Sequence, residues 1–278
     1  MNFKMEHSGQ ATDDEVFIKD ALKIVEEGER HKVTLRLLGA LAVKIHSHEY
    51  DDLHRRLKRL GNEKQAFTDI DFMAYSKERA KVRKLMEDVL GFKHSGHFML
   101  MHGKERLLYH HPEELYHVDI FFDKLQFSHD IHFGSNAKKG RLGLDLPTIP
   151  LADLLLEKLQ IHEINEKDIK DIIVLLRAHE IDQLDQKETI NIKYVAKILA
   201  DDWGFWYDAK INLNKVKVFA DNYRLKDLLT PEDLTDIYDK VDRIIMFIDA
   251  EPKTQKWKKR GKKGTSKEWW RPVETIVR

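Results

Sequence analysis

Apolar and polar residues alternate along residues 67–75, a pattern that predicts a β-strand with one buried face. Successive side chains of a strand point to opposite faces, so Ile70 and Phe72 belong to one face. Asp69 and Asp71 then share the other face. Because neighbouring carboxylates repel each other, the pair is either solvated on a half-exposed edge strand or bound to a cation such as Mg²⁺.

A second strand-like run covers residues 115–123 and carries one further acid in its middle. Asp119 lies between Val118 and Ile120, where a charge requires a compensating partner. If this strand lies beside the strand of Asp69 and Asp71, three carboxylates share one face of a sheet. Three oxygen ligands in that arrangement are typical of two-metal phosphoryl or nucleotidyl transfer.

The other elements predicted in the first 150 residues alternate between helices and strands. Apolar residues recur at helical spacing over residues 13–30 and 76–90, which predicts two amphipathic helices. Residues 33–38 predict a strand that reaches a turn at Gly39, and a helix follows over residues 41–45. Shorter strands are predicted over residues 98–101, 106–109, 131–133 and 142–144. This order predicts an α/β (α+β) fold with a mixed sheet.

From residue 151 the periodicity becomes helical, first over residues 151–159 and later across residues 191–248. Thr230 followed by Pro231 is a helix start, because threonine caps a helix and proline suits its first position. We therefore expect an α/β core over residues 1–150, an all-helical domain over residues 151–250, and a tail over residues 251–278.

Charge changes the interpretation of this tail. The chain has 48 basic and 48 acidic residues, but residues 253–271 hold nine Lys or Arg and one acid. The remaining residues therefore carry 39 basic against 47 acidic side chains. Lysine and arginine interleaved with Trp257, Trp269 and Trp270 suit an RNA backbone and its bases. The alternative is an arm docked on the acidic body, with its tryptophans buried in grooves.

The chain has no cysteine, no apolar run long enough to span a membrane, and no apolar signal core in residues 1–10. These features lead us to expect a cytoplasmic protein. Eight of the 15 histidines fall between His94 and His132. Their spacing matches no helical metal motif, so polar surface is the favoured interpretation and a dedicated histidine–metal site the minor one.

Two features could contact phosphates. Gly39 would let the backbone approach an anion at the start of the following helix. The basic segment 54–59 is either a solvated face or the source of one phosphate-binding cation. The candidates in that segment are Arg55, Arg56, Lys58 and Arg59.

Taken together, these motifs resemble the DNA polymerase β-like nucleotidyltransferase superfamily, and most closely its AbiEii/AbiGii-type toxin enzymes and their relatives. The resemblance covers roughly residues 33–180. Asp69, Asp71 and Asp119 match the family's carboxylates, and Gly39 matches the glycine of its loop. Ala40 stands where the family prefers Gly or Ser.

The resemblance also extends to residues 151–172. It implies that Lys158 points its ammonium at the phosphates of the nucleotide. The residues alone equally allow another interpretation, in which Lys158 lies at the margin of an apolar helix face and extends its ammonium into water. Asp168 and Asp171 lie on one face of the next helix, either as surface acids or, by resemblance, as groups that orient Lys158.

These matches imply a Mg²⁺-dependent enzyme that moves a nucleoside monophosphate from a nucleoside triphosphate (NTP) to an acceptor. Asp69, Asp71 and Asp119 would hold two Mg²⁺, while Gly39, Ala40 and Lys158 would contact the triphosphate. The acceptor could be RNA, a protein or a small molecule, and the enzyme could belong to a toxin–antitoxin pair. The alternative is a non-catalytic nucleotide- or RNA-binding module on the same fold, which Ala40 favours.

Overall fold

The computed structural model describes residues 13–59, 67–94 and 106–273 as a mixed α/β protein. Its main sheet has five strands in the order β1-β2-β5-β4-β3. The strands are β1 (Leu35–Leu38), β2 (Asp69–Ala74), β3 (Lys93–His94), β4 (Arg106–His110) and β5 (His117–Phe122). The pair β2–β5 is parallel and the other neighbours are antiparallel, so the predicted mixed sheet is confirmed.

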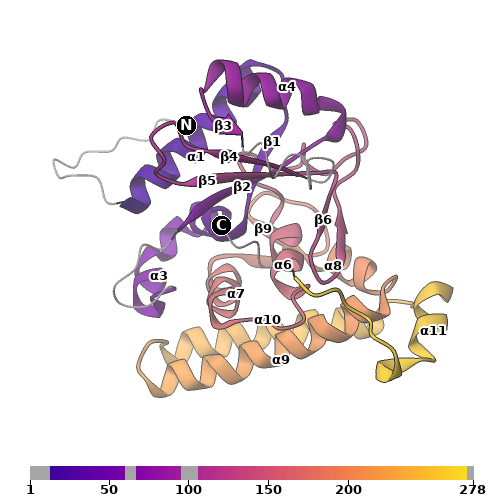
Figure 1. The fold of residues 1–278 in the computed structure, drawn as a ribbon. Coiled ribbons are helices and arrows are strands. Elements are labelled where there is room, and N and C mark those ends of the chain that lie inside the picture. The colour runs from indigo at the N-terminus through magenta and orange to yellow at the C-terminus, as the bar shows by residue number, and fades with distance from the viewer. Residues whose placement is uncertain (1–12, 60–66, 95–105, 274–278) are drawn as a thin grey trace.

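Helices cover both faces of this sheet (Figure 1). Helices α1 (Asp13–Arg30) and α4 (Arg79–Lys84) lie on the face away from the long helices at the bottom of the view. A 3-10 turn precedes α4 and a π-helical turn over Leu85–Val89 follows it, which together account for the helix predicted over residues 76–90. Helices α2 (Gly39–His46) and α3 (Asp51–Leu57) follow β1.

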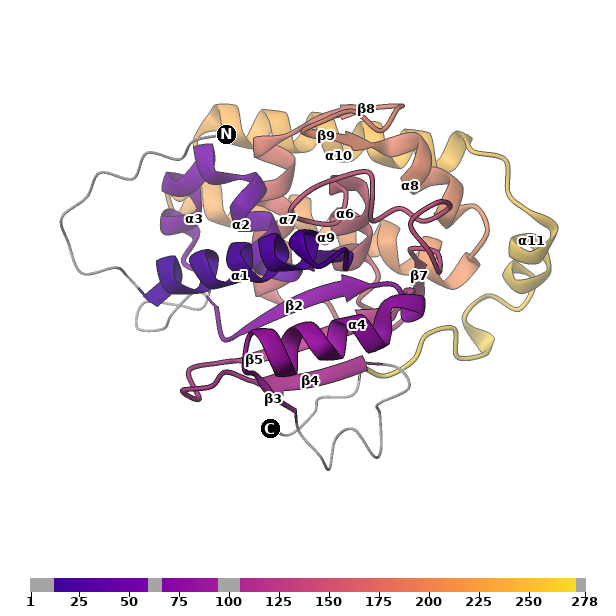
Figure 2. The same ribbon diagram turned by 90° about the horizontal axis from the view of Figure 1, so that it is seen from above.

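The chain after residue 150 is mainly helical (Figure 2). Its helices are α6 (Leu151–Leu159), α7 (Glu166–Ala178), α8 (Ile192–Leu199), α9 (Trp203–Leu225) and α10 (Pro231–Ala250). The predicted start of α10 is confirmed, because the Thr230 side chain accepts from the backbone of Asp233 and the Asp233 side chain accepts from Thr230. Helices α9 and α10 form a long antiparallel pair beneath α6 and α7.

Two sequence predictions fail in this region. The part after residue 150 is not all-helical, since β8 (Glu180–Asp182) pairs in parallel with β9 (Thr189–Asn191). Each of these strands has one apolar residue, too few to create an alternating pattern. The strand predicted over residues 142–144 is a turn, because the Leu142 N–H donates to the Tyr75 hydroxyl instead of to a neighbouring strand. The strand predicted over residues 98–101 lies outside the described residues.

Residues 148–149 connect the main sheet to the helices that follow residue 150. Thr148 pairs in parallel with Leu37 of β1, and the Ile149 N–H donates to the Leu37 carbonyl oxygen (2.8 Å). Helix α6 begins two residues later and packs on α2 and α7. A hairpin of β6 (Lys124–Gln126) and β7 (Asp130–His132) extends from the end of β5 and includes most of the strand predicted over residues 131–133.

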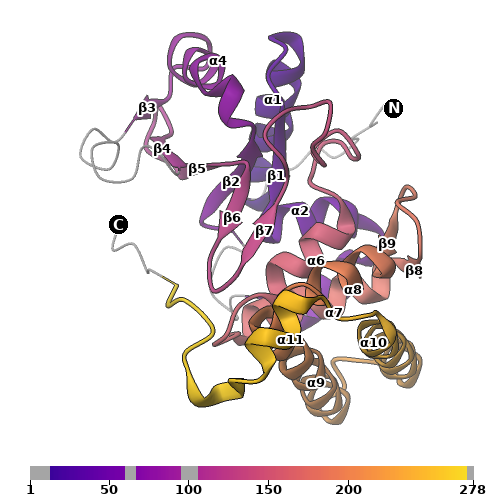
Figure 3. The same cartoon turned by 90° about the vertical axis from the view of Figure 1, so that its right-hand side faces the viewer.

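The C-terminal arm, residues 251–273, turns back along the molecule (Figure 3). It contains helix α11 (Gln255–Gly261) and a 3-10 turn over Gly264–Ser266. Trp257 packs edge-on against Trp206 of α9 with ring centroids 5.1 Å apart, and the Trp269 Nε1–H donates to Asp208 of α9 (3.0 Å). The described part of the tail is therefore a docked arm, as one of the two sequence interpretations predicted.

Candidate functional site

The register of the sheet brings the three predicted carboxylates to one face. Asp71 of β2 lies directly beside Asp119 of β5, and Asp69 lies beside His117. Neighbouring positions in register point to the same side of a sheet, so Asp69, Asp71 and Asp119 share that side. Asp69 and Asp71 are partly exposed, whereas Asp119 is 1 % exposed and lies 3.9 Å from Arg106 Nη1. The acids therefore form a row that runs from the surface into the sheet.

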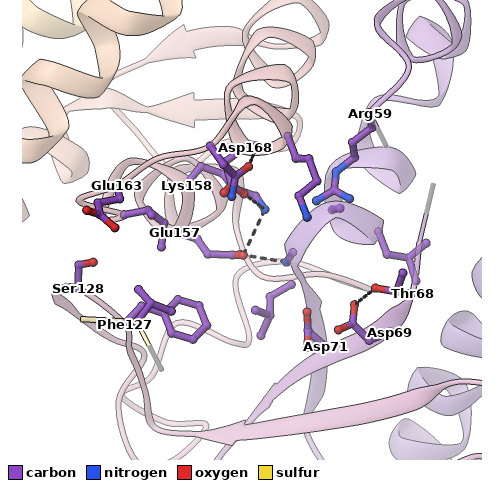
Figure 4. A pocket seen from close by; sticks show the side chains of 18 of the residues that line it. Arg59, Thr68, Asp69, Asp71, Phe127, Ser128, Glu157, Lys158, Glu163 and Asp168 are labelled. Carbon is purple, nitrogen blue, oxygen red and sulfur yellow. Dashed lines mark hydrogen bonds and ion pairs between the residues drawn. The ribbon is translucent and has the colours of Figure 1, made fainter. Parts of the chain in front are cut away.

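A cavity of about 570 Å³ opens above Asp69 and Asp71, between the sheet and helices α6 and α7 (Figure 4). Gly39, Ala40 and Lys158 also line it, so five of the six predicted site residues surround one space. Asp119 lies below, at the buried end of the row. The volume is within the range of pockets that hold small ligands, about 300–1,000 Å³.

Gly39 is required at its position by two features of the backbone. Its φ angle is +75°, a left-handed conformation that residues with a Cβ rarely adopt. A Cβ there would also lie 3.2 Å from Asp71 Oδ2. The Gly39 N–H donates to Glu157 Oε2 (3.0 Å), so this turn is tied to α6 as well as to β2. Glycine thus brings the start of α2 against the acidic strand.

Lys158 is buried, with 5 % of the residue exposed. Its Nζ lies 3.1 Å from both Asp168 Oδ1 and Asp171 Oδ2, and 3.7 Å from Glu157 Oε1. The interpretation of Lys158 as a lysine that reaches water is therefore wrong. The interpretation of Asp168 and Asp171 as groups that orient Lys158 agrees with these distances. In Figure 4, Lys158 and Asp168 lie across the cavity from Asp69 and Asp71.

These charges determine each other's protonation. Burial alone would lower the pKa of Lys158, but the carboxylates of Asp168, Asp171 and Glu157 raise it above its ordinary value. Lys158 is therefore an ammonium at neutral pH. Burial raises the pKa of Glu157, although Lys158 and the hydrogen bond from Gly39 act in the opposite direction.

Arg59 is the member of the basic segment that reaches this site. It lines the cavity, and its Nε–H donates to Asp171 Oδ1 (2.8 Å). Burial would lower the pKa of Arg59, but Asp171 raises it. Arg55 instead pairs with Asp52, and Arg56 donates to the Leu228 carbonyl oxygen (2.6 Å). The sequence offered four candidates, and only tertiary contacts distinguish them.

Sequence reasoning missed Glu157 and the contribution of the arm. A carboxylate inside the apolar run of residues 151–159 was itself a signal, because a buried charge requires a partner. Trp270 also lines the cavity and stacks on His162, with ring centroids 4.1 Å apart and planes inclined by 12°. No local pattern could indicate that residue 270 returns to a cavity formed by residues 39–71 and 157–168.

We compared the chain with protein-family models, curated proteins and solved structures, and found no match in any of the three. Among the described helices, none combines the length and apolar character needed to cross a membrane.

Proposed function

We propose that this protein is a Mg²⁺-dependent nucleotidyltransferase that moves a nucleoside monophosphate from an NTP to an acceptor. One observation carries the proposal. Asp69 and Asp71 of β2, Gly39 at the start of α2, and Lys158 of α6 line a single cavity although they are far apart in the sequence. An acidic strand facing a glycine turn and a cation suits transfer of a nucleotidyl group, because it can hold metal ions and neutralise the charge of the phosphates.

The donor set fits Mg²⁺. Asp69, Asp71 and Asp119 supply carboxylate oxygens, the hard ligands that this ion prefers, from adjacent positions of one sheet face. Bound by these three residues, two Mg²⁺ would activate the acceptor hydroxyl and stabilise the departing pyrophosphate.

The protein's own residues would bind and orient the triphosphate. Gly39 allows close approach of the backbone beside Asp71, and half-buried Ala40 lines the same wall. Lys158, held by Asp168 and Asp171, supplies a fixed positive charge opposite the acids. Arg59 adds a second cation, oriented by the same Asp171. The carboxylates of Glu157, Asp168 and Asp171 already balance the charges of Lys158 and Arg59. The negative charge of the triphosphate would therefore be neutralised mainly by the metal ions that enter with it.

In this proposal residues 1–150 form the nucleotidyltransferase core and residues 151–250 a predominantly helical domain. Both contribute to the cavity, since Lys158 and Asp168 come from the second part. The acceptor would be RNA, a protein or a small molecule. The resemblance to AbiEii/AbiGii-type enzymes favours a toxin of a toxin–antitoxin pair. RNA is supported by the lysines of residues 253–271, which are largely exposed while the tryptophans face the body.

A non-catalytic nucleotide- or RNA-binding module on the same fold is the second candidate. One contact favours its RNA-binding form: the Gly39 N–H already donates to Glu157, so the turn would have to exchange this hydrogen bond to bind a phosphate of NTP. A nucleotide-binding module would retain affinity for NTP without transferring any part of it, whereas an RNA-binding module would bind RNA without NTP.

The test combines a transfer assay with thermal melts. Labelled NTPs are incubated with Mg²⁺ and total RNA or protein extract, for the parent and for Asp71→Asn. We expect transfer by the parent and none by the variant, which keeps its size and loses the charge that holds the cations. Mg²⁺ with the correct NTP should raise the Tm of the parent, because a ligand that binds the folded state stabilises it. The variant should lose most of that rise.

Asp88→Asn, at an exposed position in the π-helical turn after α4 and outside the cavity, is the matched control and should behave as the parent. Without Mg²⁺, Asp71→Asn should be at least as stable as the parent, since repulsion from Asp69 is relieved. An NTP-dependent Tm rise without transfer would favour the binding module. A parent whose Tm responds to no nucleotide would contradict the nucleotidyltransferase and favour the binding module in its RNA-binding form.

A further inference from the structure

A second cluster of ligand-type side chains lies at the opposite end of α2 from Gly39. His46 ends α2, His179 directly follows α7, and Glu188 directly precedes β9. One ring nitrogen of each histidine and one carboxylate oxygen of Glu188 all lie within 4.8 Å of one another. Among the described residues, this is the group of three potential metal ligands that meets that distance. Helix α2 is eight residues long, so the cluster is about 10 Å along the helix from the candidate active site.

The carboxylate of Glu188 joins the two histidines. Its Oε2 lies 3.1 Å from His46 Nδ1 and 3.6 Å from His179 Nδ1. The two rings meet edge to face, with centroids 5.7 Å apart. Glu188 adopts a left-handed backbone with φ +57°, an unusual conformation for a residue with a Cβ. Surrounding structure must hold Glu188 in this conformation, since a left-handed backbone is unfavourable for a residue with a Cβ.

Residues around His46 fix which ring nitrogen faces Glu188. The other nitrogen, Nε2, is hydrogen-bonded to the Thr148 hydroxyl and lies 3.5 Å from Asp145 Oδ2. A hydroxyl or carboxylate behind the second nitrogen is the usual support of a metal-binding histidine, because it fixes the ring and its tautomer. His46 therefore presents Nδ1 to the cluster in a fixed orientation.

One of the two histidines, His179, is incompletely satisfied by the rest of the protein. It directly follows α7 and its Nδ1 lies 3.6 Å from Glu188 Oε2. His179 is also 4 % exposed, and its Nε2 has no hydrogen-bond partner within the described residues. Contacts inside the protein thus leave this buried histidine incompletely satisfied.

The nearest cation on the facing helix is already neutralised. The Nζ of Lys240 on α10 lies 3.1 Å from Asp236 and donates to the Leu176 carbonyl oxygen (2.8 Å). Glu188 is exposed, so an ion could enter from solvent along the side of its carboxylate.

We propose that His46, His179 and Glu188 bind one transition-metal dication of the Zn²⁺ type. Two imidazoles and one carboxylate are a ligand set that Zn²⁺ accepts, with a fourth position left for water. The site is distinct from the oxygen-only site of Asp69 and Asp71, which suits Mg²⁺. Its ligands are the last residue of α2, the residue that follows α7 and the residue that precedes β9, so the ion would fasten the end of α2 to the end of α7, the helix that carries Asp168.

The test uses the full chain, stripped of metal by a chelator and titrated with Co²⁺, whose visible absorption reports ligand number and geometry. We expect one equivalent of Co²⁺ to bind, Zn²⁺ to displace it, and excess Mg²⁺ to leave it bound. Glu188→Gln and His179→Gln should each weaken binding more than about 100-fold, beyond the range typical of residues that only support a ligand. Asp145→Asn should weaken it about tenfold.

Two controls isolate the site. His132→Gln removes an exposed histidine outside the cluster and should leave Co²⁺ binding unchanged. Asp71→Asn should leave it unchanged as well, which separates this inference from the proposed enzyme activity. Circular dichroism of the metal-free proteins checks that the variants fold, and Glu188→Gln provides a test at an exposed position. Failure of the parent to bind one equivalent, or unchanged binding in both Glu188→Gln and His179→Gln, would overturn the proposal.

Discussion

Lys158 and the carboxylates around it form a buried group in which each charge depends on the others. Asp168 and Asp171 approach its ammonium to 3.1 Å, and Arg59 contacts Asp171 from the other side. Removing one member of such a group leaves an uncompensated buried charge, which costs about 3–5 kcal/mol. Lys158 therefore contributes to the stability of the fold as well as to the candidate site.

Replacing Lys158 by methionine tests this dependence. Lys158→Met keeps the length of the side chain and leaves Glu157, Asp168 and Asp171 with Arg59 as their remaining cation. We expect the free energy of unfolding at neutral pH to fall by about 3–5 kcal/mol, measured by urea denaturation. Lys193→Met, at an exposed position of α8, is the control and should change it by less than about 0.5 kcal/mol.

The loss should depend on pH in a defined direction. The folded-state pKa of Glu157 is already raised by burial, and removing Lys158 raises it further. A raised carboxyl pKa means that the folded state binds its proton more tightly than the unfolded state. The loss in free energy of unfolding caused by Lys158→Met should therefore be complete at pH values above the folded-state pKa of Glu157. It should become smaller as the pH falls toward about 4, the ordinary pKa of a glutamate carboxyl in the unfolded chain. If the loss in free energy of unfolding is the same at neutral pH and near pH 4, this explanation is contradicted.

At the scale of elements, Asp208 of α9 connects three segments. Its carboxylate lies 2.8 Å from His129 Nε2 and 2.9 Å from His162 Nδ1, and it accepts a hydrogen bond from Trp269 of the arm. Gly204, one turn earlier on α9, allows this close packing, since a Cβ there would lie 2.6 Å from the Trp269 carbonyl oxygen. The arm is thus fixed to α9, and its neighbour Trp270 is brought to the cavity.

Asp208→Asn should loosen this junction. Burial opposes the charge of Asp208, but its hydrogen bonds with His129, Trp269 and His162 lower its pKa below the ordinary value. A carboxyl group whose pKa is lower in the folded state than in the unfolded state stabilises the fold at pH values above its unfolded-state pKa. This stabilisation is lost as the pH falls through the folded-state pKa. We expect the variant to lose about 1–3 kcal/mol at pH 7 and less below about pH 4, measured by urea denaturation.

The control for Asp208→Asn is Asp239→Asn, because Asp239 is an exposed acid on α10 that contacts Arg243. It should change the free energy of unfolding by less than about 0.5 kcal/mol. If Asp208→Asn is as stable as the parent at pH 7, the arm is not held by this carboxylate.

At the scale of the whole molecule, an acidic body carries a basic arm that has two distinct sides. The tryptophans and Arg260 face the body, where Arg260 lies 4.9 Å from the centre of the Trp203 ring. The exposed lysines of the arm include Lys258, Lys259, Lys262 and Lys263. Docking therefore partly buries the tryptophans and leaves this positive charge available to an anionic partner.

Changing these four lysines to glutamine should separate docking from RNA binding. Because the side chains are exposed, we expect the Tm to stay within about 2 °C of the parent. If RNA is the partner, its affinity should fall, and the slope of log K against log salt should decrease by about one for each lysine that contacts a phosphate. Filter binding over a range of salt concentrations measures both quantities.

Four exposed lysines elsewhere, Lys19, Lys77, Lys193 and Lys197, form the matched control when changed to glutamine. This control changes net charge equally but leaves the arm intact. Equal loss of RNA affinity in both variants would mean that overall charge, and not the arm, determines binding. No RNA binding by the parent would leave docking as the role of the arm.

The sequence by itself determined features that depend on local periodicity. Alternation at residues 67–75 predicted β2 and put Asp69 and Asp71 on one face, and the Thr230–Pro231 pair predicted the start of α10. These predictions succeed because neighbouring side chains and caps obey short-range geometry. The short strands β8 and β9 were not predicted, because their pairing with each other stabilises them and their sequences show no alternation of apolar and polar residues.

Only the tertiary structure decided which distant residues meet. It put Asp119 beside Asp71, selected Arg59 among four cations, and surrounded Lys158 with carboxylates. It also joined His46, His179 and Glu188, which lie up to 142 residues apart and share no motif. Strand register and helix packing follow from the burial of the whole core, so no local window contains that information. The sequence shows which chemical group each residue carries, whereas the fold determines which other residues that group contacts.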